Sequence, residues 1–161
     1  MILYFLRHGR AEQHSGGPDA ERRLTKKGTN ELKGAAPLWR RLNLRPEVIL
    51  TSPLVRAVET AEIASDALEV KARPKTDDRL QPGATWASMA QAMADHHQAA
   101  RVMFVGHNPD FESAIEVLSG AGAVRLRPGG VACLEFPGVP EPGQGEIAWL
   151  LDPDLYLEDG G

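Results

Sequence analysis

The sequence predicts an α/β protein whose central sheet is mostly parallel. Short apolar runs, rich in β-branched and aromatic residues, alternate along the chain with longer segments of helical periodicity, which is typical of such folds. Two of the runs, Ile2–Leu6 and Val102–Val105, are apolar at nearly every position, as expected for strands buried on both faces. The 161 residues fit one domain, residues 1–161, because no linker or internal repeat divides them.

The remaining elements of the parallel part follow from the same patterns. Val48–Thr51 and Val70–Ala72 are the other expected strands of this part. Helices are expected over Thr25–Leu42, Pro53–Leu68, Ala84–His96 and Pro109–Leu118. The first helix carries an apolar stripe that indicates its sheet-facing side, formed by Leu32, Ala35, Ala36, Trp39 and Leu42.

The C-terminal part of the chain has a different pattern. Val131–Phe136 and Glu146–Leu151 are strand-like and are joined by the Gly- and Pro-rich segment Pro137–Gly145. This arrangement predicts an antiparallel hairpin added to the parallel sheet. The last residues, Asp152–Gly161, are expected to lie along the surface.

Composition excludes several classes of function. The net charge is −4, with 22 acidic and 18 basic residues and no basic run, which argues against nucleic acid or a membrane surface as a partner. Cys133 is the only cysteine, so neither an intrachain disulfide nor a thiolate metal cluster is expected. Met1 leads directly into a strand without a basic flank or a long apolar run, and we expect a cytoplasmic protein.

The most informative motif is Leu6-Arg7-His8-Gly9 at the end of the first strand. In α/β proteins ligands bind at the carboxyl ends of strands. A guanidinium beside an imidazole suits a phosphoryl group, because the first can clamp oxygens and the second can attack phosphorus. Taken alone, the motif is equally consistent with a charged pair that merely closes a strand.

Two further strand ends share one arrangement. Thr51-Ser52-Pro53 and Gly106-His107-Asn108-Pro109 each offer a helix cap followed by a proline at the first helical position, with Asn108 the expected cap of the second. Each helix N-terminus would then point its free N–H groups at the rim of the sheet. His107 could instead only hydrogen-bond nearby backbone.

Arg56 lies in the first turn of its helix, where the helix dipole disfavours a cation by ~0.3–1 kcal/mol. The residue is either a solvated arginine, or one paired with Glu59, or one that faces a bound anion. Because three strand ends each carry an Arg or His before a turn or helix start, the combined pattern favours a phosphate pocket.

These motifs together resemble the histidine phosphatase superfamily, the phosphoglycerate-mutase-like enzymes. The resemblance rests on Leu6-Arg7-His8-Gly9, Thr51-Ser52-Pro53 with Arg56-Ala57 and Thr60-Ala61, Val105-Gly106-His107-Asn108, and Arg22-Arg23-Leu24-Thr25 with Gly28. It implies a three-layer α/β/α sandwich. Because the segment Ala72–Trp86 is too short for a large lid insertion, the chain is most similar to the small phosphohistidine phosphatases of the SixA type.

The resemblance implies roles for individual residues. His8 corresponds to the nucleophile that forms a transient phosphohistidine, and its other ring nitrogen should donate to a carbonyl. Arg7, Arg56 and His107 correspond to the groups that bind the phosphoryl oxygens. Arg22 is either a further oxygen ligand or a solvated loop charge. No cofactor is expected.

The proton donor to the leaving group is not identifiable from the sequence. Gln81 stands near where many family members place a carboxylate, and Asp77 or Asp78 could substitute or could be loop and cap residues. An imidazole, with a conjugate-acid pKa of ~6.5, leaves with little help, whereas an alkoxide needs a proton. Phosphohistidine on a partner protein is therefore the favoured substrate. The alternatives are a small phosphorylated metabolite or nucleotide, and a phosphate-binding module without catalysis.

A metal site is not expected. His96 and His97 are adjacent and would point about 100° apart on a helix, and His14 lies in a Gly-rich loop, so no compact ligand cluster is present. These three histidines are expected at the surface. Trp86 lies either at the rim of the pocket or in the packing at the start of its helix.

Overall fold

The computed structural model describes residues 1–14 and 16–157. The strands among these residues are β1 (Ile2–Arg7), β2 (Val48–Thr51), β3 (Lys75–Thr76), β4 (Arg101–Gly106), β5 (Val131–Glu135) and β6 (Glu146–Leu151). They form one six-stranded sheet in the order β3-β2-β4-β1-β5-β6. The four strands β1 to β4 are parallel, whereas β5 is antiparallel to both β1 and β6. The predicted mostly parallel sheet with an antiparallel C-terminal hairpin is confirmed.

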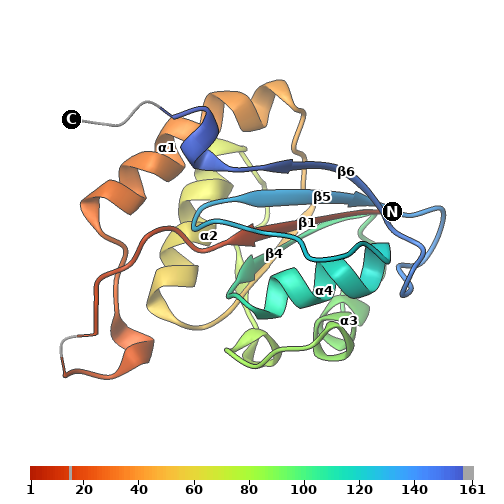
Figure 1. Cartoon of the computed structure of the whole chain (residues 1–161), viewed down its shortest axis with the longest axis horizontal. Coiled ribbons are helices and arrows are strands. Elements are labelled where there is room, and N and C mark those ends of the chain that lie inside the picture. The colour runs from red at the N-terminus through yellow and green to blue at the C-terminus, as the bar shows by residue number, and fades with distance from the viewer. Residues whose placement is uncertain (15, 158–161) are drawn as a thin grey trace.

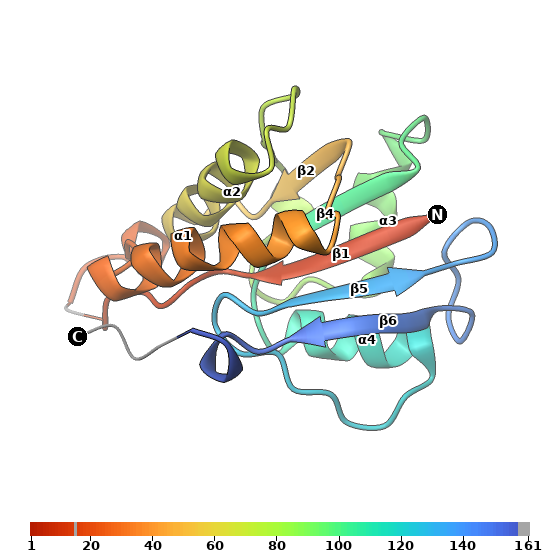
Figure 2. The same ribbon diagram turned by 90° about the horizontal axis from the view of Figure 1, so that it is seen from above.

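Helices cover both faces of this sheet. The helices α1 (Lys26–Arg41) and α2 (Val55–Ala67) pack on one face, and α3 (Trp86–Ala94) and α4 (Asp110–Ser119) pack on the other (Figures 1 and 2). Figure 2 shows the sheet between the two pairs of helices. The protein is therefore a three-layer α/β/α sandwich, and the layers follow from strands that are apolar on both sides.

The central strands show why their sequences are continuously apolar. In β1, Leu3 and Phe5 pack in the cluster that includes α3 and α4, whereas Tyr4 and Leu6 pack in the cluster that includes α1 and α2. Successive side chains of a strand point to opposite faces, so a strand between two helical layers needs apolar residues at every position. The stripe predicted for α1 is also buried, with Trp39 fully inaccessible, although Leu42 at the end of that stripe is exposed.

The predicted third strand is displaced along the chain. The segment over Val70–Ala72 is not a strand, because the backbone amide of Val70 bonds the carbonyl of Ser65 and ends α2 in a turn, with Glu69 at a φ of 52°. The strand β3 lies a few residues later and pairs with the end of β2. It is a two-residue edge strand with exposed polar side chains, so hydrophobic periodicity could not indicate it.

Both predicted proline-led helix starts are wrong in detail. The first residue of α2 is Val55 rather than Pro53, because the hydroxyl of Ser52 accepts the amide of Leu54 and closes a turn before the helix. In α4 the residue before the helix is Pro109, and Asn108 makes no cap bond. Helix α1 does begin as expected, since the hydroxyl of Thr25 accepts the amide of Gly28.

Two other expectations concern the segments around the core. Between α2 and α3 the chain holds only β3 and a short 3-10 turn, Asp78–Leu80, so the expectation of no large lid is confirmed. The C-terminal residues do not simply lie along the surface, because Pro153 is buried and Tyr156 packs against the α1–α2 side of the core. Residues 158–161 lie outside the described part. No helix among the described residues is long and apolar enough to span a bilayer.

The core side chain whose loss we expect to destabilise the protein most clearly is Phe104. It lies in the central strand β4, is fully buried, and its ring lies 5.5 Å from that of Phe5. Phe104→Ala should lower the free energy of unfolding by about 3–5 kcal/mol, because a cavity remains on the side of the sheet that α3 and α4 cover. Urea unfolding followed by circular dichroism measures this. Val117→Ala, which truncates a 49% exposed side chain on α4, is the control and should change the value by less than about 0.5 kcal/mol.

Candidate active site

The candidate site lies where three adjacent parallel strands end together. In the sheet, Arg7 of β1 is level with Gly106 of β4, and Thr51 of β2 is level with Val105. The residues that follow, His8, Ser52 and His107, therefore leave the sheet at one edge. A pocket of about 850 Å³ opens there, and its lining includes Arg7, His8, Arg22, Arg56 and His107. The structure thus brings together all five residues that the sequence singled out.

The His8 ring is held by the neighbouring backbone. Its Nδ1 lies 2.8 Å from the carbonyl oxygen of Gly9, which confirms the predicted contact of one ring nitrogen with a carbonyl. The amide of Gly9 in turn donates to the hydroxyl of Thr60 at 3.1 Å, and that hydroxyl donates to the carbonyl of Arg56 at 2.7 Å. An Nδ1–H donated to Gly9 leaves Nε2 with a free lone pair, the form in which imidazole is a nucleophile.

His107 lies beside His8, with ring centroids 5.1 Å apart. Its Nε2 is 2.7 Å from the hydroxyl oxygen of Ser52, and that oxygen also accepts the amide of Leu54. The hydroxyl proton of Ser52 is free to bond Nε2, and in that tautomer the neutral ring of His107 carries its proton on Nδ1. The sequence suggested Ser52 only as a helix cap, and its contact with His107 becomes visible only when β2 and β4 are paired.

Burial keeps both rings uncharged. Desolvation is the main cause that lowers the pKa of His8 to about 4; the bond to Gly9 opposes this shift, and the positive charges of Arg56 and Arg7 add to it. Desolvation also lowers the pKa of His107 to about 3, with contributions from His8 and Arg56. Both histidines are therefore neutral at pH 7, and a neutral ring is the form in which an imidazole nitrogen keeps a free lone pair.

Three buried nitrogens of the pocket residues have no hydrogen-bond partner among the described residues. They are Nε of Arg7, Nε of Arg56 and Nδ1 of His107. A buried donor without a partner costs about 1–3 kcal/mol, so such groups seldom gather in one place without a reason. Arg56 and His107 are each only 4% exposed, which excludes the interpretation of Arg56 as a solvated surface arginine. Together these nitrogens form a set of donors suited to the oxygens of an anion.

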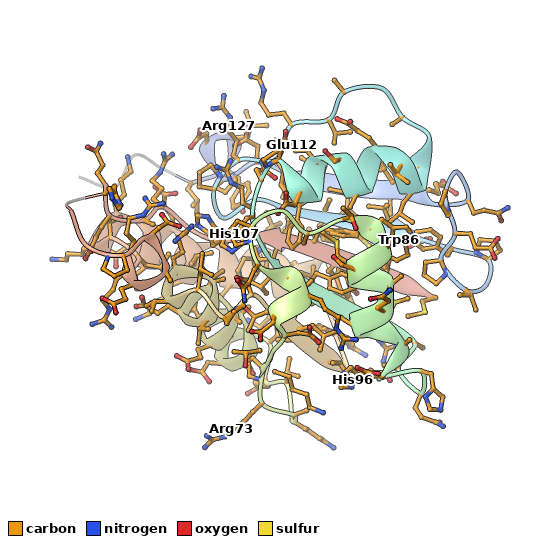
Figure 3. All side chains as sticks on the ribbon, turned by 90° about the horizontal axis from the view of Figure 1, so that it is seen from below. Arg73, Trp86, His96, His107, Glu112 and Arg127 are labelled. Atoms are coloured by element: carbon orange, nitrogen blue, oxygen red, sulfur yellow. The ribbon has the colours of Figure 1, made fainter. Side chains whose placement is uncertain are left out.

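Arg7 is oriented by a carbonyl that other residues hold. Its guanidinium donates to the carbonyl of Leu126 at 2.9 Å, and the side-chain amide of Asn108 donates to the same oxygen at 2.8 Å. The carboxylate of Glu112 accepts the amide of Leu126 at 3.0 Å and the side chain of Asn108 at 2.6 Å. Figure 3 shows Glu112 in the first turn of α4, close to Arg127 in the segment that carries Leu126.

Glu112 also supplies charge. Burial lowers the pKa of Arg7, and the negative charge of Glu112 is the main influence that opposes this shift. Glu112 could not be predicted from the sequence, because its partner Leu126 is 14 residues away in a loop without regular structure. The only available signal was its place near the start of a helix, where a carboxylate is equally explained by its favourable interaction with the helix dipole.

Asp19 joins the two remaining arginines. One carboxylate oxygen accepts from Arg22 at 2.7 Å, and the other accepts from Arg56 at 3.1 Å. Arg56 also donates to the backbone carbonyl of Asp19 at 2.9 Å, whereas Glu59 pairs with Arg23 and not with Arg56. Hydrogen bonds from Arg22 and then Arg56 lower the pKa of Asp19, so this carboxylate is ionised. Arg22 is thus a fixed part of the pocket wall and not a freely solvated loop charge.

The residues considered for proton donation do not reach the pocket. Asp77 caps the short turn after β3 and binds the guanidinium of Arg79 at 2.7 Å, which lowers its pKa, and neither it nor Asp78 lines the pocket. Trp86 packs against the core at the start of α3, as Figure 3 also shows. Among the pocket-lining residues that the structure describes, Asp19 is the sole carboxylate.

The other histidines lie elsewhere. His14 and His97 are exposed as expected, whereas His96 is half-buried in the turn after α3, away from His107 (Figure 3). No group of three or more His, Cys, Asp or Glu side chains that could hold a metal ion is found within residues 1–14 and 16–157.

Comparisons with known proteins agree with this geometry. Residues 3–125 match the family model of the histidine phosphatase superfamily, branch 1. An uncharacterized protein of Picosynechococcus sp. is 36% identical over 126 residues, which cover 74% of this chain and 73% of that protein.

Solved structures with the same fold cover nearly the whole chain. The protein histidine phosphatase SixA, in a complex with tungstate, has a TM-score of 0.84 at 23% identity and covers 96% of this chain and 99% of its own. A candidate phosphohistidine phosphatase SixA from Agrobacterium tumefaciens has a TM-score of 0.80 at 25% identity, with 94% and 97% covered.

Removing the support of Arg7 should weaken oxyanion binding. In Glu112→Ala the amide of Leu126 and the side chain of Asn108 lose their acceptor, so the carbonyl that orients Arg7 is no longer held, and we expect the Kd for inorganic phosphate to rise about tenfold. Glu112→Gln keeps an acceptor oxygen, so its Kd for phosphate should rise less than that of Glu112→Ala. Isothermal titration calorimetry measures both values.

The control is Glu116→Ala, because Glu116 lies one turn later on α4 and accepts the amide of Val124 in the same loop without contacting Leu126. Its phosphate Kd should stay within about twofold of the parent. Equal weakening in Glu112→Ala and Glu116→Ala would show that the loop as a whole, and not the Arg7 support, is responsible.

The depressed histidine pKa values predict a loss of stability in acid. In the unfolded chain these rings take up protons below a pKa of about 6.5, whereas in the folded protein they stay neutral to about 4 and about 3, so stability falls as the pH drops below 6.5. At pH 5 the penalty is at most about 2 kcal/mol for each ring.

Urea unfolding at pH 7 and pH 5, in buffers free of phosphate, measures this difference. His8→Gln should lose less stability between the two pH values than the parent protein, because one such ring is gone. An identical loss in both proteins would contradict the depressed pKa of His8.

Proposed function

Because this chain belongs to the histidine phosphatase superfamily and is a phosphatase, we propose that it removes the phosphoryl group from phosphohistidine on a partner protein. The observation that carries the proposal is the set of unpartnered buried nitrogens on Arg7, Arg56 and His107, gathered beside the neutral imidazole of His8. Similar structures include the protein histidine phosphatase SixA in complex with tungstate, which is an oxyanion.

The first step is attack by His8. Its Nε2 lone pair approaches phosphorus in line with the leaving group, and a new N–P bond forms as the N–P bond of the substrate breaks. The substrate imidazole, protonated on its other ring nitrogen, keeps the bonding electron pair and leaves as a neutral molecule. Nε–H of Arg7, Nε–H of Arg56 and Nδ1–H of His107 donate to the three phosphoryl oxygens. A loose phosphoryl transition state needs positioning and charge stabilisation above all, and these groups supply both.

The second step releases phosphate. Water attacks phosphorus of the phosphorylated His8, the N–P bond breaks, and inorganic phosphate and neutral His8 are restored. The bond from Nδ1 to Gly9 holds the ring in place and stabilises the positive charge that develops on it while the phosphoryl group is attached.

The proposed substrate class is supported by the lack of a carboxylic acid that could donate a proton among the described lining residues. Asp19, the sole carboxylate among the described lining residues, is ionised between Arg22 and Arg56. An alkoxide leaving group would have to depart without a proton, which is slow, whereas an imidazole departs readily. The open pocket without a large lid also suits a phosphoryl group carried by a protein surface.

Hydrolysis of a small phosphorylated metabolite is the second candidate. The pocket of about 850 Å³ is large enough for a molecule of that size, and its additional cations would suit an acidic one. A phosphate-binding module without catalysis is disfavoured, because a neutral His8 flanked by oxygen-binding donors is more than binding requires.

Turnover of matched substrates tests the proposal. We expect the kcat/KM for a phosphohistidine peptide to exceed that for an alkyl phosphate at least about a hundredfold, because an imidazole protonated on its far nitrogen leaves as a neutral molecule, whereas an alkoxide needs an acid at the leaving oxygen. His8→Gln should abolish both activities, and vanadate should inhibit the parent protein. His96→Gln, outside the pocket, is the control and should retain activity.

Two outcomes would overturn the proposal. An equal or higher kcat/KM for the alkyl phosphate would favour the second candidate function, hydrolysis of a small phosphorylated metabolite. Undiminished hydrolysis in His8→Gln would reject His8 as the nucleophile.

A further inference from the structure

The pocket carries more positive charge than a single phosphoryl group requires. Besides Arg7 and Arg56, its lining includes Arg10, Arg22 and Lys27, against the carboxylate of Asp19. The whole chain has a net charge of −4, so cations are concentrated at this pocket although the protein is acidic. Such a distribution favours anionic partners at the site over the rest of the surface.

Two of the three additional cations are already paired. Arg10 binds Glu31 at 2.8 Å and Asp154 at 3.1 Å, and Arg22 binds Asp19. Lys27 is exposed, and within residues 1–14 and 16–157 it forms no ion pair. Lys27 is therefore the pocket cation with charge to offer a second anionic group.

The backbone fixes the position of Lys27. Its neighbour Gly28 packs so closely on the backbone of Arg10 that a side-chain carbon there would collide with the Arg10 carbonyl oxygen. The amide of Thr25 donates to the same carbonyl at 2.9 Å. The first turn of α1 is thus pressed against the chain two residues after His8, which sets Lys27 at the mouth of the pocket.

The local sequence of this turn opposes the helix dipole. Lys26 and Lys27 open α1 and no acidic residue accompanies them in the first turn. Cations are disfavoured at a helix N-terminus, and a bound anion would offset that effect. Lys26 is also exposed but does not line the pocket, so of the two lysines only Lys27 borders the site where a ligand would bind.

We propose that Lys27 is a specificity residue that binds the carboxylate of an Asp or Glu close to the phosphohistidine of the partner protein. The inference rests on the proposed function and narrows its substrate to phosphohistidine in an acidic segment. The pocket of about 850 Å³ extends from His8 to Gln13 and Lys27, which leaves room for side chains that flank the phosphorylated residue.

The test compares two synthetic peptides that carry phosphohistidine, introduced with phosphoramidate, and differ only in having Glu or Gln beside it. The parent protein should have a kcat/KM about three- to tenfold higher for the Glu peptide, the range expected of an exposed ion pair reinforced by the surrounding cations. Lys27→Gln should bring the ratio to about one, Lys27→Glu should reverse it, and Lys27→Arg should preserve it. Lys26→Gln is the matched control and should keep the parent ratio.

The possible outcomes distinguish failure of the role of Lys27 from failure of the proposed function. The role of Lys27 is overturned if the parent protein hydrolyses both peptides equally. It is also overturned if Lys26→Gln loses the preference for the Glu peptide as fully as Lys27→Gln does. Either result leaves the proposed function standing. A parent protein that hydrolyses para-nitrophenyl phosphate but neither peptide overturns both. A ratio that changes only with Lys27, and that falls as salt is added, supports the proposal.

Discussion

The parallel register of β1, β4 and β2 determines where every group of the pocket lies. Since Arg7 is level with Gly106 and Thr51 with Val105, the chain leaves three neighbouring strands at one edge of the sheet. Parallel pairing is stable only when both faces of a sheet are covered, and the two layers of helices provide that cover. The site thus depends on the same core that stabilises the fold.

A rigid frame is needed because the pocket itself is unfavourable for folding. It contains unpartnered buried nitrogens on Arg7, Arg56 and His107, and two imidazoles that burial keeps neutral. Each of these features costs free energy that the core must offset. The supporting contacts are therefore extensive, with Ser52, Thr60, Asp19 and Glu112 each bonded to a pocket residue or to the backbone that holds one.

Prediction from the sequence succeeded where a pattern repeats locally. The apolar runs identified five of the six strands, and the strand-end motifs identified Arg7, His8, Arg56 and His107. It failed at β3, since an exposed two-residue edge strand has no periodicity, and at Asn108, whose side chain bonds Glu112 and Leu126 and caps nothing. Such side-chain partners depend on which distant segments meet, and no local pattern records that.

The sequence by itself determined which strands are buried on both faces and which strand-end residues line the pocket, because strand burial and strand-end motifs are properties of a few consecutive residues. Only the tertiary structure decided the states of those side chains. Burial made both histidines neutral, the pairing of β2 with β4 brought Ser52 to His107, and Asp19 joined Arg22 to Arg56. Desolvation and long-range hydrogen bonds arise only when distant parts of the chain come together, and for this reason the sequence alone could not predict these states.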